Sequence, residues 1–226
     1  MTRFLTIGVS AIALTGLTAC IPIPIKGNVS FVATEVTADS APLERLGATE
    51  GMAILSRNGS AGDGGIAACV SDAFAKASPG TRIVPAKQVR EAIGGTLAGA
   101  KSMAADGEIA QAMRSAQTAP ALAALGLRYV TFIEGATQSS GARSAGCATY
   151  VCEDISDKRT RIEATIWNAT TGDKLAMRRT ETAGQTSTVG TIGIAVYTYA
   201  PTEATACKDM AGKLAHDVSG REYPAQ

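Results

Sequence analysis

Histidine and aromatic residues are scarce in this chain, and neither sign of charge is in excess. The 226 residues include one histidine and 4% aromatic side chains, and 21 Lys and Arg stand against 20 Asp and Glu. Because phosphate binding needs a basic excess or a basic patch, this balance argues against nucleic acid as a partner. The nearest approach to a basic patch is Arg178-Arg179 with Lys174, which we interpret as the solvated face of a strand.

The scarcity of metal-binding side chains argues against the common protein metal sites. Such sites bring together pairs of closely spaced thiolates, usually with histidine. Here one pair of cysteines is close in sequence, and His216 is the single histidine. We therefore predict no metal and no cofactor.

Two motifs suggest enzyme chemistry, and neither has the spacing that the chemistry needs. The stretch from Gly62 to Ala67, GDGGIA, fits the dinucleotide pattern G-x-G-x-x-A, but no acidic residue ends the next strand about 20 positions later. A flexible turn that starts a helix is favoured. His216-Asp217 cannot form a catalytic pair within one helix, because neighbouring side chains point about 100 degrees apart. We interpret His216 as a surface cation at a helix end.

The most apolar stretch of the chain is at its start and has the layout of a secretory signal. MTRFLTIGVSAIALTGLTAC contains one charge, at Arg3, and an apolar run too short to span a bilayer comfortably. Its last four residues, Leu17 to Cys20, resemble the bacterial lipobox, in which the cysteine is alkylated by a diacylglycerol and the chain is cut before it. An ordinary signal cleaved at small residues is the alternative. We expect a lipoprotein signal peptide over residues 1–19 and a lipid, with palmitate, on Cys20.

The lipid predicts where the protein is held. Each buried methylene contributes about 0.8 kcal/mol, so two or more acyl chains anchor a protein stably. Residue 21 is isoleucine rather than aspartate, which by resemblance to enterobacterial lipoproteins favours transfer to the outer membrane. We expect the periplasmic face of the outer membrane, with the inner membrane as the alternative.

Four cysteines remain after Cys20, and an even number in an exported chain predicts disulfides. Four thiols allow three alternative pairings. Cys147 and Cys152 bracket the four residues ATYV and can close a small loop, which leaves Cys69 for Cys207. We predict both of these disulfides.

The apolar periodicity predicts an α/β (α+β) fold, in which helices flank a mixed β-sheet, as one compact periplasmic domain over residues 51–226. Residues 20–50 are expected to form the lipidated cysteine and an extended tether, because IPIPI at 21–25 cannot be helical. Residues 135–158 suggest a polar excursion between two strands. Residues 184–199 are left open as a strand, a loop or a membrane hairpin. A strand is possible at 29–36 within the tether range, and the other expected strands are 52–55, 83–85, 127–133 and a hairpin over 161–177. The expected helices are 66–77, 89–93, 108–116, 119–125 and one from Pro201 to Val218.

Three parts of the chain resemble the lipoproteins of the curli-secretion-channel and penicillin-binding-protein-activator group. They are LGLRYV at 125–130, the hairpin IWNATTGDKL at 166–175 and the closing Ala-rich helix. The resemblance covers residues 51–220 and implies an α/β domain with a mixed sheet, a lipid anchor and a role in binding envelope proteins. The Cys147–Cys152 segment and the Ala-rich stretch at 96–125 have no match in the group, so specific activities do not carry over.

These observations predict a non-enzymatic, lipid-anchored protein that binds or scaffolds another periplasmic or outer-membrane component. Its expected partners are the membrane, through the lipid, and an envelope protein, and association between copies of the chain is left open. The alternative is an exported hydrolase whose site has no recognisable motif.

Overall fold

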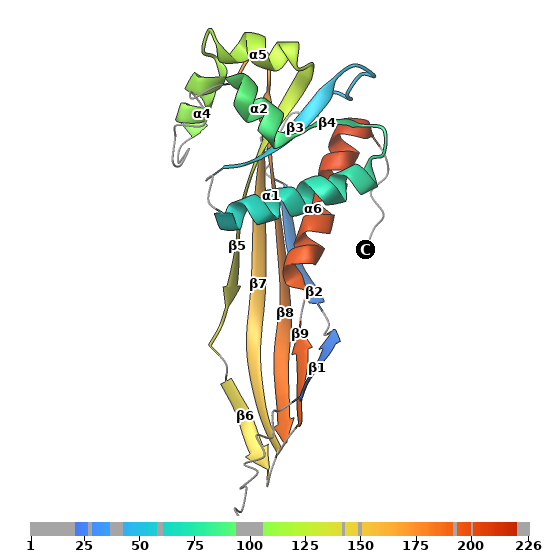
Figure 1. Cartoon of the computed structure of the whole chain (residues 1–226), viewed down its shortest axis with the longest axis vertical. Coiled ribbons are helices and arrows are strands. Elements are labelled where there is room, and N and C mark those ends of the chain that lie inside the picture. The colour runs from blue at the N-terminus through green and yellow to red at the C-terminus, as the bar shows by residue number, and fades with distance from the viewer. Residues whose placement is uncertain are drawn as a thin grey trace, which may run out of the picture.

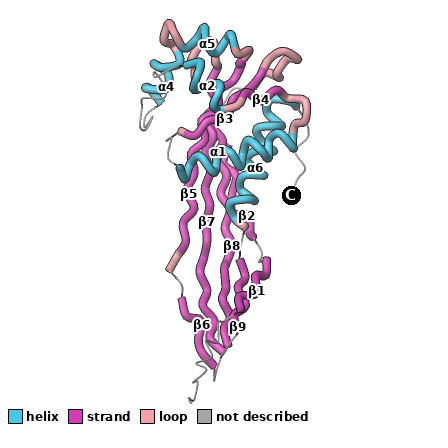
Figure 2. Tube along the Cα trace, in the orientation of Figure 1, coloured by secondary structure: helices cyan, strands magenta, loops and turns pink. Residues whose placement is uncertain are grey.

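A helix-bearing head stands at one end of a long, narrow β-blade (Figure 1). The computed structural model describes residues 21–26, 29–36, 43–57, 61–93, 106–141, 143–148, 151–191, 194–199 and 201–220. The expected signal peptide and Cys20 lie outside the described residues. The head contains the described helices and the strand segments packed against them. The blade comprises the described residues of 21–26, 143–159 and 183–199, which extend beyond the helices as strands alone (Figure 2).

The described strands form one mixed sheet of nine strands, which confirms the predicted fold class. The strand order is β1-β9-β8-β7-β5-β3-β4, with β2 also paired to β8 and β6 to β7. The pairs β3–β4, β3–β5 and β1–β9 are parallel, and the others are antiparallel. The strands are β1 Ile21–Lys26, β2 Val29–Val36, β3 Gly51–Ser56, β4 Arg82–Val84, β5 Leu127–Ser139, β6 Arg143–Ala148, β7 Val151–Asn168, β8 Lys174–Thr191 and β9 Ile194–Tyr199.

Helices cover both faces of the sheet in the head. They are α1 Ala61–Ala77, α2 Ala86–Ile93, α4 Asp106–Met113, α5 Thr118–Ala124 and α6 Thr202–Ser219. One buried cluster packs α1 and α6 against side chains such as Ile133 and Ile162, and the other packs α2, α4 and α5 around Phe132 and Trp167. Neighbouring residues thus enter opposite cores, because successive strand side chains alternate between faces. Among the described residues, no helix has the length and hydropathy needed to cross a membrane.

The two long helices pack against each other, and the buried face of α6 is the one that the apolar spacing predicted. Along α6, Met210, Leu214 and Val218 are almost fully buried in the cluster shared with α1. Cys69 on α1 and Cys207 on α6 are joined by a disulfide with their Cα atoms 5.9 Å apart. The bridge therefore ties the first long helix of the domain to the last.

The polar excursion expected at residues 135–158 is wrong as a description of the backbone. Residue 139 is still in β5, and β7 already begins at Val151, so β7 and β8 are each 18 residues long. The stretch at 184–199 is also strand, in β8 and β9. The strands of the blade extend beyond the helices that pack on the head. Their sequences therefore lack the alternation of apolar and polar residues that indicates a strand with one buried face.

Two further expectations differ in detail. Residues 21–26 and 29–36 fall in the range expected as a tether, and they are extended, but they pair with β9 and β8 within the sheet. Arg178, expected on a solvated strand face, is 7% exposed, and its side chain extends from β8 to α6. Its carboxylate partner, Asp217, explains how a charge is accommodated there.

The turn between β7 and β8 depends on a glycine, and we expect Gly172→Ala to destabilise the fold. Gly172 has φ +66°, and an added Cβ would lie 2.7 Å from Arg114 Cγ and 3.1 Å from Met113 Cβ. A side chain in this conformation and space should lower the free energy of unfolding by about 1–3 kcal/mol. Urea denaturation measures the change.

Gly107→Ala is the matched control, because Gly107 lies in α4 with open space around an added Cβ. Alanine is a better helix former than glycine, so this variant should gain about 0.5–1 kcal/mol. Equal effects of the two variants would contradict the role assigned to the Gly172 turn.

Candidate interaction surface

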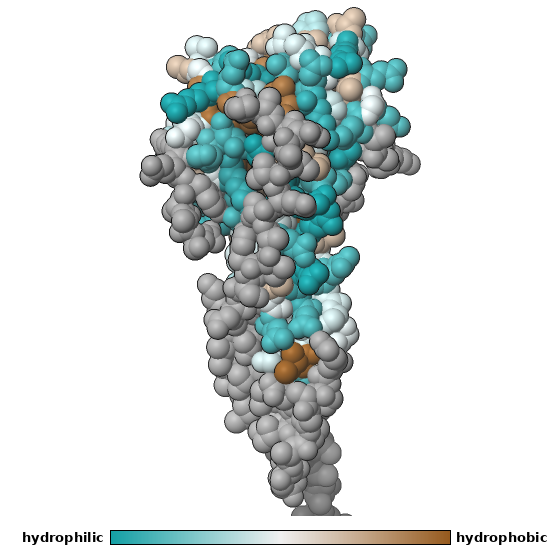
Figure 3. Space-filling view, turned by 180° about the vertical axis from the view of Figure 1, so that it is seen from behind, coloured by the Kyte–Doolittle hydropathy of each residue, from teal (hydrophilic) through white to brown (hydrophobic). Residues whose placement is uncertain are grey.

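Charged side chains line the face of the sheet opposite α1 and α6, just below the helices of the second core. We call this group the charge ladder; its members are Arg57, Asp106, Glu134, Arg159, Arg161, Glu163, Arg179 and Glu181. Strand register explains the gathering: Glu134 is opposite Glu163, and Glu163 is opposite Arg179. One step toward the blade, Arg161 is opposite Glu181. Figure 3 views this face, where hydrophilic colours dominate the described surface along the strands.

Like charges stand directly opposite one another at the centre of the ladder. Two carboxylates on neighbouring strands repel, and here arginines compensate for Glu134 and Glu163. Arg179 donates to Glu163 from Nη2 at 2.9 Å and from Nε at 3.2 Å, while Arg161 approaches the same carboxylate at 3.8 Å. Arg57 Nε lies 3.7 Å from Glu134. The alternation of charge is therefore part of what holds these strands in register.

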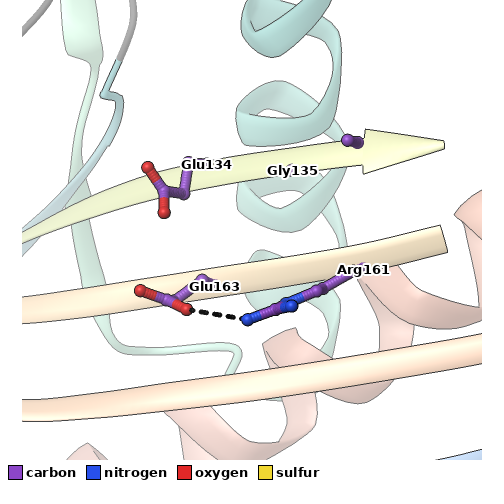
Figure 4. Close-up of a pocket in the computed structure, with 5 residues that line it drawn as sticks. Glu134, Gly135, Arg161 and Glu163 are labelled. Carbon is purple, nitrogen blue, oxygen red and sulfur yellow. Dashed lines mark ion pairs between the residues drawn. The ribbon is translucent and has the colours of Figure 1, made fainter. Parts of the chain in front are cut away.

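A shallow hollow opens on the ladder. Its lining consists of Glu134, Gly135, Ala136, Arg161 and Glu163. In Figure 4 the labelled carboxylates come from adjacent strands, and Arg161 points toward Glu163. Glu163 is largely buried by its partners, whereas the Arg161 side chain is 51% exposed. The hollow thus offers the Glu134 carboxylate, whose side chain is 36% exposed, and one accessible guanidinium to a partner.

The ladder continues to the head through Asp106. This carboxylate accepts a hydrogen bond from Arg57 at 2.7 Å and from Lys174 at 2.6 Å. Burial alone would raise the pKa of Asp106, but Lys174 and then Arg57 outweigh it and hold the pKa below its usual value. Asp106 therefore remains ionised near neutral pH and fixes α4 to the strands beneath it.

A second polar group is enclosed on the other face, between β8 and α6. Asp209 is 2% exposed and accepts hydrogen bonds from the hydroxyl of Thr180 and from Lys213 Nζ, the latter at 2.5 Å. Lys213 Nζ also donates to Thr180 Oγ1 at 2.9 Å. Nearby, Arg178 Nε donates to Asp217 at 2.8 Å. Burial, more than any other cause, lowers the pKa of Lys213, and Asp209 partly offsets it. These hydrogen bonds and ion pairs stabilise the contact between β8 and α6. Because the groups are enclosed there, a substrate would have little access to them.

The structure does not bring the tempting enzyme motifs together. Asp217 pairs with Arg178, while His216 is exposed in the last turn of α6. Ala61 already begins α1, so GDGGIA at 62–67 lies within the helix instead of forming a loop before it. The lining of the hollow includes no serine, threonine, cysteine or histidine. Within the described ranges, no group of three or more His, Cys, Asp or Glu could hold a metal ion.

The cysteines are placed in two different ways. Cys69 and Cys207 form the predicted disulfide. Cys147 in β6 and Cys152 in β7 are directly opposite in register, and their side chains lie outside the described part of the chain. The backbone thus has the arrangement that a cross-strand bridge needs, and the Cys147–Cys152 disulfide stays a prediction.

Sequence reasoning missed the charge ladder, although its signal is present. Arg159, Arg161 and Glu163 are spaced by two residues, as are Arg179 and Glu181. Period-two charge indicates one face of a strand. The sequence does not reveal the pairing register of β5, β7 and β8, which brings these charges next to one another.

No protein-family model matches the chain, and no curated protein matches it. Three-dimensional comparison finds a PelC dodecamer from Paraburkholderia phytofirmans, with a TM-score of 0.39 and 12% identity, over 84% of this chain and 99% of that one. It also finds the lipoprotein GNA1162 from Neisseria meningitidis, with a TM-score of 0.30 and 12% identity, over 63% of this chain and 83% of that one. Scores this low support no conclusion about function or assembly.

Proposed function

We propose that this chain is a non-enzymatic, lipid-anchored envelope protein that binds another envelope component through the charge ladder. The observation that carries the proposal is the hollow at Glu134, Arg161 and Glu163, on a sheet face that no described helix covers at that point. The lipobox at Cys20 supports the envelope location. The outer membrane is proposed because residue 21 is isoleucine.

The charges of the ladder suit recognition of a polar protein surface. Paired charges at an interface contribute to orientation and association rate more than to raw affinity. Arg159 and Arg161 are more than half exposed even though both have carboxylate partners, so a partner can share their guanidinium donors. An acidic or amide-rich segment of another protein fits this surface best.

Site-specific photo-crosslinking in intact cells tests the proposed surface. A benzoylphenylalanine at Ala136, which is exposed and lines the hollow, should yield a discrete crosslinked species. The matched control is the same probe at Lys87, whose side chain is 84% exposed on α2 in the head. Mass spectrometry identifies the crosslinked protein. Crosslinking from Lys87 and not from Ala136 would place the contact elsewhere.

We expect Cys20 to carry the lipid. Labelled palmitate should enter the wild-type protein, and labelling should disappear in Cys20→Ser. A Cys20→Ser protein exported by an ordinary signal should also crosslink less from Ala136, because anchoring sets the effective concentration at the partner. Equal labelling of both proteins would contradict the lipoprotein assignment without affecting the ladder itself.

A further inference from the structure

Five strands meet in register at the end of the blade farthest from the head. One row across the sheet runs from Cys147 to Cys152, Gly190, Ala195 and Pro22. We call this end the blade tip; it consists of this row and the described residues beyond it, Ala148, Val151, Thr191, Ile194 and Ile21. Residues more than 170 positions apart in the sequence therefore form one edge of the molecule.

The blade tip carries no charged residue in its sequence. Charges reappear one row toward the head at Glu153 and in the following row at Asp154. Residues 149–150 and 192–193, which lie outside the described residues, read TY and IG in the sequence and are also uncharged. In the charge ladder, in contrast, charges recur at every second residue, at Arg159, Arg161 and Glu163. The sequence thus changes character where the blade ends.

The lipid-bearing cysteine is covalently next to this edge. Cys20 directly precedes Ile21, and consecutive Cα atoms are about 3.8 Å apart. Ile21 pairs with Ile194 at the tip. A lipid on Cys20 would therefore leave the molecule at the blade tip with no intervening spacer.

The neighbouring edge strand is unsuited to pairing with another strand. Pro22 and Pro24 lack the N–H that a ladder needs, and prolines in sheets occupy edges with that position facing outward. Because β1 pairs with β9 along Ile21–Lys26, its outer edge lacks these two donors. This argues against a protein that adds a strand to the β1 edge of the tip.

We propose that the blade tip docks directly on a lipid bilayer, so that the blade stands on the membrane and holds the head away from it. The two tip rows have a depth of about 7 Å at 3.3 Å per residue, within the depth of about 5–10 Å to which apolar surfaces enter the headgroup region. In the sequence, Tyr150 stands between the tip residues Ala148 and Val151, and tyrosine favours membrane interfaces. The nine residues 151–159 of β7 that lie in the blade then set the head about 30 Å above the tip.

Tryptophan fluorescence tests this docking, because the chain contains one tryptophan, Trp167, buried in the head. An Ile194→Trp variant adds a reporter at the tip, and Gln138→Trp adds one at an exposed position of β5. Both proteins, lipidated and with Cys20→Ser, are mixed with phosphatidylethanolamine–phosphatidylglycerol vesicles containing brominated lipid. We expect quenching and a blue shift for Ile194→Trp and no change for Gln138→Trp or wild type.

A second measurement uses charge instead of a reporter. In the unlipidated protein, Ile194→Lys should lower the vesicle partition coefficient about five- to tenfold, and Gln138→Lys should leave it unchanged. Retention of the Cys69–Cys207 disulfide and of the circular dichroism spectrum shows that both variants are folded.

The outcomes separate this inference from the proposed function. Unquenched Ile194→Trp in vesicle-bound protein, or equal quenching at Gln138→Trp, overturns docking through the tip. Quenching confined to Ile194→Trp supports it, including in a protein that receives no lipid at Cys20 and so fails the palmitate test.

Discussion

Asp209→Ala is expected to lower the free energy of unfolding by about 3–5 kcal/mol, whereas Glu91→Ala should change it by less than about 0.5 kcal/mol. Each carboxylate has a lysine four residues away on its helix, Lys213 at 2.5 Å and Lys87 at 3.8 Å. The first pair is enclosed, with side chains 14% and 3% exposed, and the second is 84% and 64% exposed. Removing one member of a buried pair leaves an uncompensated charge, and exposed pairs contribute little.

The pH dependence of the Asp209→Ala effect follows from the lysine left behind. Burial already lowers the pKa of Lys213 below 10.5, and Asp209 is the main group that opposes this. Without Asp209 the charged lysine is disfavoured further in the folded state. The loss of stability is therefore full below the lowered folded pKa and shrinks as the pH rises toward 10.5, where the unfolded lysine also becomes neutral.

Urea unfolding of both variants at several pH values measures these effects. Adding Lys213→Met to Asp209→Ala should recover part of the loss, because the buried charge is then removed as well. Two results would show that the Asp209–Lys213 pair does not stabilise the contact between β8 and α6. One is a double variant whose free energy of unfolding falls by the sum of the two single losses, and the other is an Asp209→Ala effect no larger than that of Glu91→Ala.

The elements that sequence reasoning predicted are those with one buried face. Apolar side chains at helical spacing located α1 and α6, and alternating residues with a Thr-Gly turn located the β7–β8 hairpin. Periodicity is visible where one side packs and the other is solvated. In the blade the strands extend beyond the helical layers, so their sequence has no such contrast and predicted an excursion.

Arg178 and the charge ladder show a second limit. An arginine in a strand usually indicates solvent, but Arg178 pairs with Asp217, which is 39 residues later in the chain. The same holds for Arg57 and Asp106, which are 49 residues apart. The partner that makes a buried charge acceptable comes from tertiary structure, which local patterns do not contain.

Removing the Cys69–Cys207 disulfide, by Cys69→Ala with Cys207→Ala, is expected to cause the largest loss of stability, about 5 kcal/mol. The bridge spans 138 residues, and in the chain-entropy model a loop of this length restricts the unfolded chain by that amount. The bridge also joins α1 to α6 within the larger buried cluster. Without the bridge, the two ends of the domain are no longer linked in the unfolded chain, so the conformational entropy of the unfolded state should rise.

The Cys147→Ala/Cys152→Ala protein is the matched control, since that predicted bridge closes a loop of six residues and should contribute about 2 kcal/mol. Wild-type protein under reducing conditions keeps all four sulfur atoms, so its unfolding midpoint separates the loss of the bridge from the loss of packing at Cys207, which is 1% exposed. Measured under the same reducing conditions, which open both predicted bridges, wild type and Cys69→Ala/Cys207→Ala should then unfold at similar urea concentrations, well below oxidised wild type. If the short-loop variant loses as much stability as the long-loop variant, the chain-entropy account fails for this fold, and strain or packing near the bridges must explain the difference.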